Sequence, residues 1–128
     1  MKPTILVVDD TPTNLQILVR FLSNQDWRIL VAEDGLSALE QIGRTKPDLV
    51  LLDIMMPRLD GYETCKRIRQ IPETKDIPVI FMTALSDMAD KLKGFEVGAV
   101  DYITKPYQKE EVLARVKAVL RRMYELKE

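Results

Sequence analysis

The chain has 128 residues, of which 46% are apolar and 30% are charged, and its 19 basic and 20 acidic side chains give a net charge of −1. This length suits one domain with one core, and the composition excludes a disordered chain. Because no excess of basic charge marks a surface for nucleic acid or for an anionic membrane, we expect neither as a direct partner.

Cysteine and histidine usage limits the chemistry further. Cys65 is the single cysteine and the chain has no histidine, so an internal disulfide, a multi-cysteine metal site and imidazole catalysis are all excluded. No apolar run approaches the roughly 18 residues that a membrane span requires, and the N-terminus lacks a secretory pattern. We therefore expect a cytoplasmic protein.

Five short apolar runs rich in Val, Ile and Leu predict strands. They are Ile5 to Val8, Ile29 to Val31, Leu49 to Leu52, Val79 to Met82 and Val100 to Ile103. The first, third and fourth runs are continuous rather than alternating, which is typical of parallel strands buried on both faces.

The segments between these runs carry apolar residues at helical spacing. The first follows a Thr11-Pro12 start signal and the third follows Asp60-Gly61, whereas the second is expected to end near Gly43. The marking residues are Leu15, Leu18, Val19 and Leu22; Leu36, Leu39 and Ile42; Tyr62, Cys65, Ile68 and Arg69; Met88, Leu92 and Phe95; and Val112, Val116, Val119, Met123 and Leu126.

Strands and helices thus alternate five times without an internal repeat or a linker. This pattern predicts an open, doubly wound α/β fold whose five-stranded parallel sheet has the flavodoxin-like order 2-1-3-4-5. Ligands of such sheets bind beyond the carboxyl ends of the strands, where the first and third strands are neighbours.

Polar side chains gather at those carboxyl ends. Asp9 and Asp10 follow the first strand, Asp53 the third, Thr83 the fourth and Lys105 the fifth. Each alone has an ordinary explanation, such as a helix cap or a solvated lysine. Together they form a constellation, and because two ionised carboxylates about 4 Å apart repel by roughly 4 kcal/mol at an effective dielectric near 20, we expect a cation beside them.

The residue types favour Mg²⁺ and phosphoryl transfer. Mg²⁺ suits a site made of a few carboxylates, waters and a phosphate oxygen. An Asp can act as a nucleophile and form an acyl phosphate, while Lys105 as a point charge and Thr83 as a hydroxyl donor would hold phosphoryl oxygens.

The same residues resemble the receiver domain of bacterial two-component response regulators over residues 3–122. The matching motifs are "VVDD" at 7–10, "LLDIMMPRLDG" at 51–61, "MTA" at 82–84 and "DYITKP" at 101–106. The resemblance implies that Asp53 is the phosphoacceptor. It also implies that Mg²⁺ is held by Asp10, Asp53 and the backbone carbonyl of Met55, with Asp9 acting through water.

The resemblance further assigns a switch. Thr83 is similar to the family's switch hydroxyl, Lys105 to its phosphoryl-binding lysine and Tyr102 to its switch aromatic, which turns inward when Thr83 is drawn toward the phosphate. The Lys105-Pro106 bond is expected to be cis, which is accessible to an X-Pro bond. A histidine kinase or a histidine phosphotransfer protein would donate the phosphoryl group, and the fourth helix, fifth strand and fifth helix would form the readout surface.

Two positions bear on how long the phosphoryl group stays. Met55 and Leu85 each lie two residues beyond a site residue, where the family often tunes hydrolysis of its acyl phosphate. Neither side chain can orient an attacking water by a strong hydrogen bond, so the resemblance leads us to expect a comparatively long-lived phosphoryl state.

The C-terminal segment leaves alternatives open. We expect the receiver to span residues 1–122 and residues 123–128 to extend its last helix. The apolar stripe that ends in Met123 and Leu126 has heptad-like spacing. The first half of this stripe could pack on the sheet while the remainder frays, or the stripe could continue as a coiled coil into an output domain, or it could pair two receivers. The surface of the fourth helix, fifth strand and fifth helix is a second candidate for pairing two receivers.

Two other functions share part of this pattern. A Mg²⁺-dependent aspartyl-phosphate phosphohydrolase also uses a strand-end Asp, Thr and Lys, but it commonly has a second carboxylate two residues after the nucleophile, where this chain has Met55. A flavin or nucleotide binder would place a loop rich in N–H donors after the first strand. That loop is the acidic "DDTPTN" here, so we expect a signalling switch rather than an enzyme.

Overall fold

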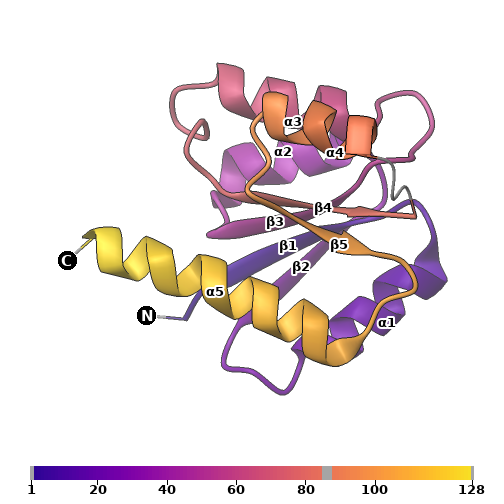
Figure 1. Ribbon diagram of the computed structural model, residues 1–128. Coiled ribbons are helices and arrows are strands. Elements are labelled where there is room, and N and C mark those ends of the chain that lie inside the picture. The colour runs from indigo at the N-terminus through magenta and orange to yellow at the C-terminus, as the bar shows by residue number, and fades with distance from the viewer. Residues whose placement is uncertain (1, 85–87, 128) are drawn as a thin grey trace.

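The computed structural model describes residues 2–84 and 88–127 of the chain (Figure 1). Within these described residues, five strands alternate with five helices in the order β1, α1, β2, α2 and onward to α5. Their bounds are β1 Thr4–Val8, α1 Pro12–Leu22, β2 Arg28–Ala32, α2 Gly35–Thr45, β3 Leu49–Asp53, α3 Gly61–Gln70, β4 Val79–Thr83, α4 Met88–Glu96, β5 Asp101–Thr104 and α5 Lys109–Lys127.

All neighbouring strands pair in parallel, in the order β2-β1-β3-β4-β5. The predicted α/β class and strand order are therefore confirmed. Figure 1 shows α1 and α5 on one face of the sheet and α2, α3 and α4 on the other, which is the three-layer arrangement that parallel strands require.

Each face of the sheet has its own apolar core. Along β1 the side chains alternate, so that Leu6 and Val8 pack with α2 and α3 whereas Ile5 and Val7 pack with α1 and α5. The central strands β1, β3 and β4 are buried on both faces, which explains why their sequences are continuous apolar runs.

The helix starts follow local sequence signals. Pro12 lies in the first turn of α1, and the side chains of Asp34 and Asp60 accept hydrogen bonds from the first turns of α2 and α3. Helix α2 ends at Thr45, two residues beyond the predicted end near Gly43, and it is closed by Lys46 in the left-handed conformation, with φ 46°.

The fifth strand is shifted by one residue from the predicted run, because Val100 precedes it and its side chain is 43% exposed. Three apolar residues of the predicted helical stripes are also largely exposed: Leu36 on α2, and Leu92 and Phe95 on α4. Since these side chains leave the core although their spacing is helical, the spacing located the helices but did not identify the buried face.

Helix α5 runs without interruption past residue 122, and it packs Val112, Val116 and Val119 in the core with Met123 partly buried against them. The side chain of Leu126 lies outside the described residues. None of the described helices combines the length and apolarity that a bilayer span requires.

Gly61, the first residue of α3, lies against the end of β3. Its N–H donates to the carbonyl of Ile54 at 2.9 Å. A Cβ at this position would collide with the carbonyl oxygen of Asp53 and would lie 2.8 Å from the Cα of Ile54. Because both are backbone atoms, they cannot move aside without displacing the end of the strand.

We predict that Gly61→Ala lowers the free energy of unfolding by about 1–3 kcal/mol through this overpacking. Gly43→Ala is the matched control, because a Cβ there meets nothing within 4 Å and lies inside α2, where Ala is more favourable by about 0.5–1 kcal/mol. Urea unfolding of both variants measures the difference, and equal stability of the two would contradict the close approach.

Candidate functional site

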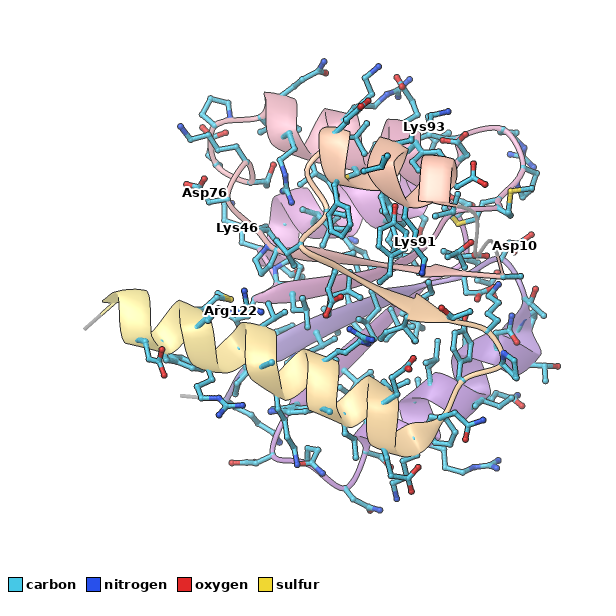
Figure 2. The ribbon with its side chains drawn as sticks, viewed as in Figure 1. Asp10, Lys46, Asp76, Lys91, Lys93 and Arg122 are labelled. Carbon is cyan, nitrogen blue, oxygen red and sulfur yellow. The ribbon has the colours of Figure 1, made fainter. Side chains whose placement is uncertain are left out.

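Three carboxylates meet at the carboxyl edge of the sheet. Asp9 and Asp10 follow β1, and Asp53 is the last residue of the neighbouring strand β3. One oxygen of each lies within 4.8 Å of the others. Figure 2 places Asp10 at the right-hand end of the sheet, far from Arg122 near the C-terminus, so the cluster occupies the edge that the strand order predicted.

The three carboxylates differ in exposure. Asp9 is completely buried and Asp53 is 1% exposed, whereas Asp10 is exposed. Asp9 is also held firmly, since its Oδ1 accepts the N–H of Thr11 at 2.9 Å and its Oδ2 accepts the amide of Asn14 at 3.2 Å. Asp10 is therefore the carboxylate with the freest access to solvent.

Lys105 brings a positive charge to this cluster from the end of β5. Its Nζ lies 3.2 Å from Oδ1 of Asp53 and 3.8 Å from Oδ2 of Asp9. The Lys105-Pro106 peptide bond is cis, which confirms the prediction. The backbone N–H of Lys105 donates to the carbonyl of Thr83 at 2.8 Å and so joins the ends of β5 and β4.

Thr83 is the last residue of β4 and pairs in register with Thr104 of β5. It is 1% exposed, which places it in the buried part of the same edge. The structure thus brings Asp9, Asp10 and Asp53 together with Lys105, and it sets Thr83 on the strand between β3 and β5.

The Asp53 carboxyl is electrostatically strained. Burial and the neighbouring Asp9 carboxylate raise its pKa to about 6, although the Lys105 ammonium and the backbone N–H of Met55 lower the pKa in part. Ionising Asp53 therefore requires a higher pH than ionising an exposed aspartate. The side chain of Met55 itself is 64% exposed and points into solvent.

Two further side chains of the site were not predicted from the sequence. Asn14 reaches Asp9 from the first turn of α1, and the hydroxyl of Tyr107 donates to Oδ2 of Asp9 at 3.3 Å. Burial and the carboxylates of Asp9 and Asp53 raise the pKa of Tyr107 well above its usual value, so its hydroxyl stays protonated. Both residues are polar and lie within six positions of a strand end, which is the signal that could have revealed them.

Tyr102, the predicted switch aromatic, is turned inward in this structure. It is 6% exposed, and its hydroxyl donates to the carbonyls of Asp90 at 3.1 Å and Lys91 at 2.8 Å in α4. Burial is the main cause that raises its pKa to about 12. Gly94 provides the necessary space, because a Cβ there would collide with the Tyr102 hydroxyl.

One predicted residue cannot be placed. Leu85 lies outside the described residues, and its expected effect on hydrolysis remains a prediction. The backbone carbonyl of Met55 stays a predicted ligand as well, since Met55 contacts the Asp53 carboxyl through its backbone N–H.

Comparisons with known proteins agree with this geometry. Residues 5–117 match the family model of the response regulator receiver domain. The chain is 42% identical over 120 residues to the DNA-binding dual master transcriptional regulator RpaA of Synechocystis, covering 94% of this chain and 50% of that protein. It is 44% identical over 122 residues to the regulatory protein PhoP of Bacillus subtilis, covering 95% and 50%.

Solved structures give the same result. A putative response regulator from Chloroflexus aurantiacus is 40% identical, with a TM-score of 0.90 over 94% of this chain and 99% of that one. The receiver domain of the sensor histidine kinase PA1611 from Pseudomonas aeruginosa, solved with a magnesium ion in its active-site cleft, is 28% identical, with a TM-score of 0.86 over 94% and 98%.

The chain spans about half the length of the curated relatives that it matches. Residues 5–117, which match the family model, contain the strands of the described sheet except Thr4 of β1, and they contain Asp9, Asp10 and Asp53. The chain belongs to the response regulator receiver family.

Proposed function

We propose that this receiver accepts a phosphoryl group on Asp53 in the presence of Mg²⁺ and that the modification switches the surface formed by α4, β5 and α5. The observation that carries the proposal is the cluster of Asp9, Asp10 and Asp53 within 4.8 Å, with the Lys105 ammonium 3.2 Å from Asp53. In this proposal Asp53 is the buried nucleophile, the three carboxylates provide the oxygens for a metal ion, and Lys105 provides a positive charge beside Asp53.

The residues at this edge suit a hard divalent cation. They offer carboxylate oxygens, which Mg²⁺ prefers, and two of the three carboxylates are buried beside each other. Asp10 and Asp53 would bind the ion directly, with the carbonyl of Met55, and Asp9 would act through water because its own oxygens already accept protein hydrogen bonds. When bound, Mg²⁺ would neutralise charge on the cluster and on the transferred phosphoryl oxygens. A receiver related to this chain was solved with magnesium in its cleft.

The chain's own residues then support an in-line transfer. An Asp53 oxygen attacks the phosphorus of a phosphohistidine, the new O–P bond forms as the N–P bond breaks, and the bonding electron pair returns to the imidazole. Lys105 holds one phosphoryl oxygen as a point charge and Thr83 donates its hydroxyl to another. The donor belongs to a partner, a histidine kinase or histidine phosphotransfer protein, because this chain contains no histidine.

The proposed readout surface has the buried side chain of Tyr102 beneath it and apolar side chains exposed on its outside. Tyr102 contacts α4 from within the fold, so a movement of Thr83 toward a phosphoryl group would change the space available to the tyrosine ring. On the outside, Leu92, Phe95 and Val100 are 54%, 48% and 43% exposed. Such side chains are typical of a surface that binds a partner, which includes a second copy of this chain.

The proposed switch would act on an output region beyond the receiver or on a second receiver. Two relatives are named as transcriptional regulators, and this chain matches half of each. We infer that residues 1–122 are the receiver, and that the last turns of α5 lead toward an output region or pair two receivers. The chain itself would then signal without touching nucleic acid.

We predict that incubation with Mg²⁺ and acetyl phosphate adds one phosphoryl group, detected by intact mass. Asp53→Asn should abolish the addition because it removes the nucleophile, and chelation of Mg²⁺ should abolish it in the wild type. Asp26→Asn is the control, since Asp26 is an exposed carboxylate whose nearest ion pair is with Lys2. Undiminished labelling of Asp53→Asn would refute the assignment of the phosphoacceptor.

The raised pKa of Asp53 gives a second prediction, for metal-free protein. The folded-state pKa is about 6 and the unfolded value is 3.8, so the stabilising contribution of the protonated carboxyl is fully present below pH 3.8 and is lost as the pH rises through 6. Asp53→Asn should therefore be more stable than the wild type at pH 7.5, by about 1–3 kcal/mol.

This advantage should shrink as the pH falls toward 4, and Mg²⁺ should also reduce it by stabilising the wild type selectively. Urea unfolding at several pH values, with EDTA or Mg²⁺, measures both effects, and Asp26→Asn should show neither. Identical curves for wild type and Asp53→Asn across pH 4–8 would show that Asp53 carries no buried charge.

The phosphoryl state should be comparatively long-lived, because the exposed thioether of Met55 offers no strong hydrogen bond to an attacking water. Met55→Asn and Met55→Glu, which supply such a bond, should shorten the lifetime. The decay of phosphoprotein mass after removal of the donor measures this. Rapid decay of the wild type in Mg²⁺ would contradict the prediction.

A further inference from the structure

Tyr107 contacts both charges of the site from the loop between β5 and α5. Its hydroxyl lies 3.3 Å from Oδ2 of Asp9, and the Nζ of Lys105 lies 6.0 Å from the centre of its ring. The ring packs against the apolar core on the α1 and α5 side of the sheet. The hydroxyl is therefore fixed at the point where the Asp9 carboxylate faces the Lys105 ammonium.

The Lys105 ammonium has two carboxylates within reach. It lies 3.2 Å from Asp53 and 3.8 Å from Asp9. Both carboxylates are buried, so each would gain by pairing with the cation, and the difference in distance alone gives only a small preference for Asp53. The position of the ammonium must depend on what else each carboxylate accepts.

The Asp9 carboxylate accepts hydrogen bonds from three uncharged donors. Thr11 donates its N–H to Oδ1 at 2.9 Å, and Asn14 and Tyr107 donate to Oδ2 at 3.2 Å and 3.3 Å. Oδ2 is also the oxygen that Lys105 approaches. Since Asn14 and Tyr107 already occupy it, the ammonium gains less by moving from Asp53 to Asp9.

We propose that Tyr107 is a positioning residue whose hydroxyl occupies Asp9 and thereby keeps the Lys105 ammonium on Asp53. This inference rests on the proposed function, because the benefit is that the cation waits beside the nucleophile that receives the phosphoryl group. Without the hydroxyl, the ammonium moves toward Oδ2 of Asp9. It is then displaced from the position in which it binds a phosphoryl oxygen, and phosphoryl transfer to Asp53 is slower.

The first test compares Tyr107→Phe with the wild type for the rate of phosphorylation by acetyl phosphate at saturating Mg²⁺. The loss of one hydrogen bond should lower the rate about three- to tenfold. Tyr124→Phe is the matched control, because Tyr124 is an exposed residue of α5, and its rate should not change. An unchanged rate in Tyr107→Phe would overturn the proposal.

A double-mutant cycle separates positioning from simple packing. In an Asp9→Asn background, also at saturating Mg²⁺, the competing negative charge is absent, so Tyr107→Phe should cause almost no further loss of rate. A loss as large as that in the wild-type background would mean that Tyr107 only supports the loop, and it would overturn the proposal.

A crystal structure of metal-free Tyr107→Phe gives a readout that needs no phosphorylation. The Nζ of Lys105 should lie closer to Asp9 than to Asp53, the reverse of the distances in the wild type. An unmoved ammonium would overturn the inference. If the wild type took up no phosphoryl group at all, the proposed function would fail while this structural result would still decide the role of Tyr107.

Discussion

The structure depends on the balance of charge at the carboxyl edge of the sheet. Asp9 and Asp53 are buried side by side and share one ammonium, that of Lys105. One cation cannot neutralise two carboxylates and the exposed Asp10 nearby. Burial, and after it the neighbouring Asp9 carboxylate, raise the pKa of Asp53. The folded protein therefore maintains an arrangement that is unfavourable in itself and that a divalent cation would relieve. This imbalance of charge is the physical basis of the proposed metal site and phosphoryl acceptor.

The rest of the fold holds these charges in place. Three central strands buried on both faces give the edge a rigid base, because close-packed side chains resist displacement. Gly61 brings the start of α3 against the backbone of Asp53. Asn14 and Tyr107 reach Asp9 from α1 and from the loop before α5, on the opposite face of the sheet from α3. Gly61 and these two residues together show that both layers of helices contribute to the geometry of the edge.

Close packing also connects the carboxyl edge of the sheet to α4. Gly94 leaves room for the Tyr102 hydroxyl, which is bonded to carbonyls of α4, while the Tyr102 ring contacts Phe81 of β4 and Phe95 of α4. A change at the end of β4 can therefore alter the packing beneath α4, whose Leu92 and Phe95 are exposed. These contacts give the proposed switch a physical route from Thr83 to the surface, through packed side chains with little free volume.

The sequence by itself determined the alternation of strands and helices, the parallel sheet and the edge where the site lies, because hydrophobic periodicity and strand-end residues are local signals. It predicted Asp9, Asp10, Asp53 and Lys105 as one cluster, and the structure brings them together. It did not reveal that Leu36, Leu92 and Phe95 face solvent, since helical spacing leaves open which face the core takes. Only the tertiary structure placed Tyr107 and Asn14 on Asp9 and the ammonium nearer to Asp53. Those contacts join segments up to 98 positions apart, and no local pattern encodes a competition between donors for one carboxylate.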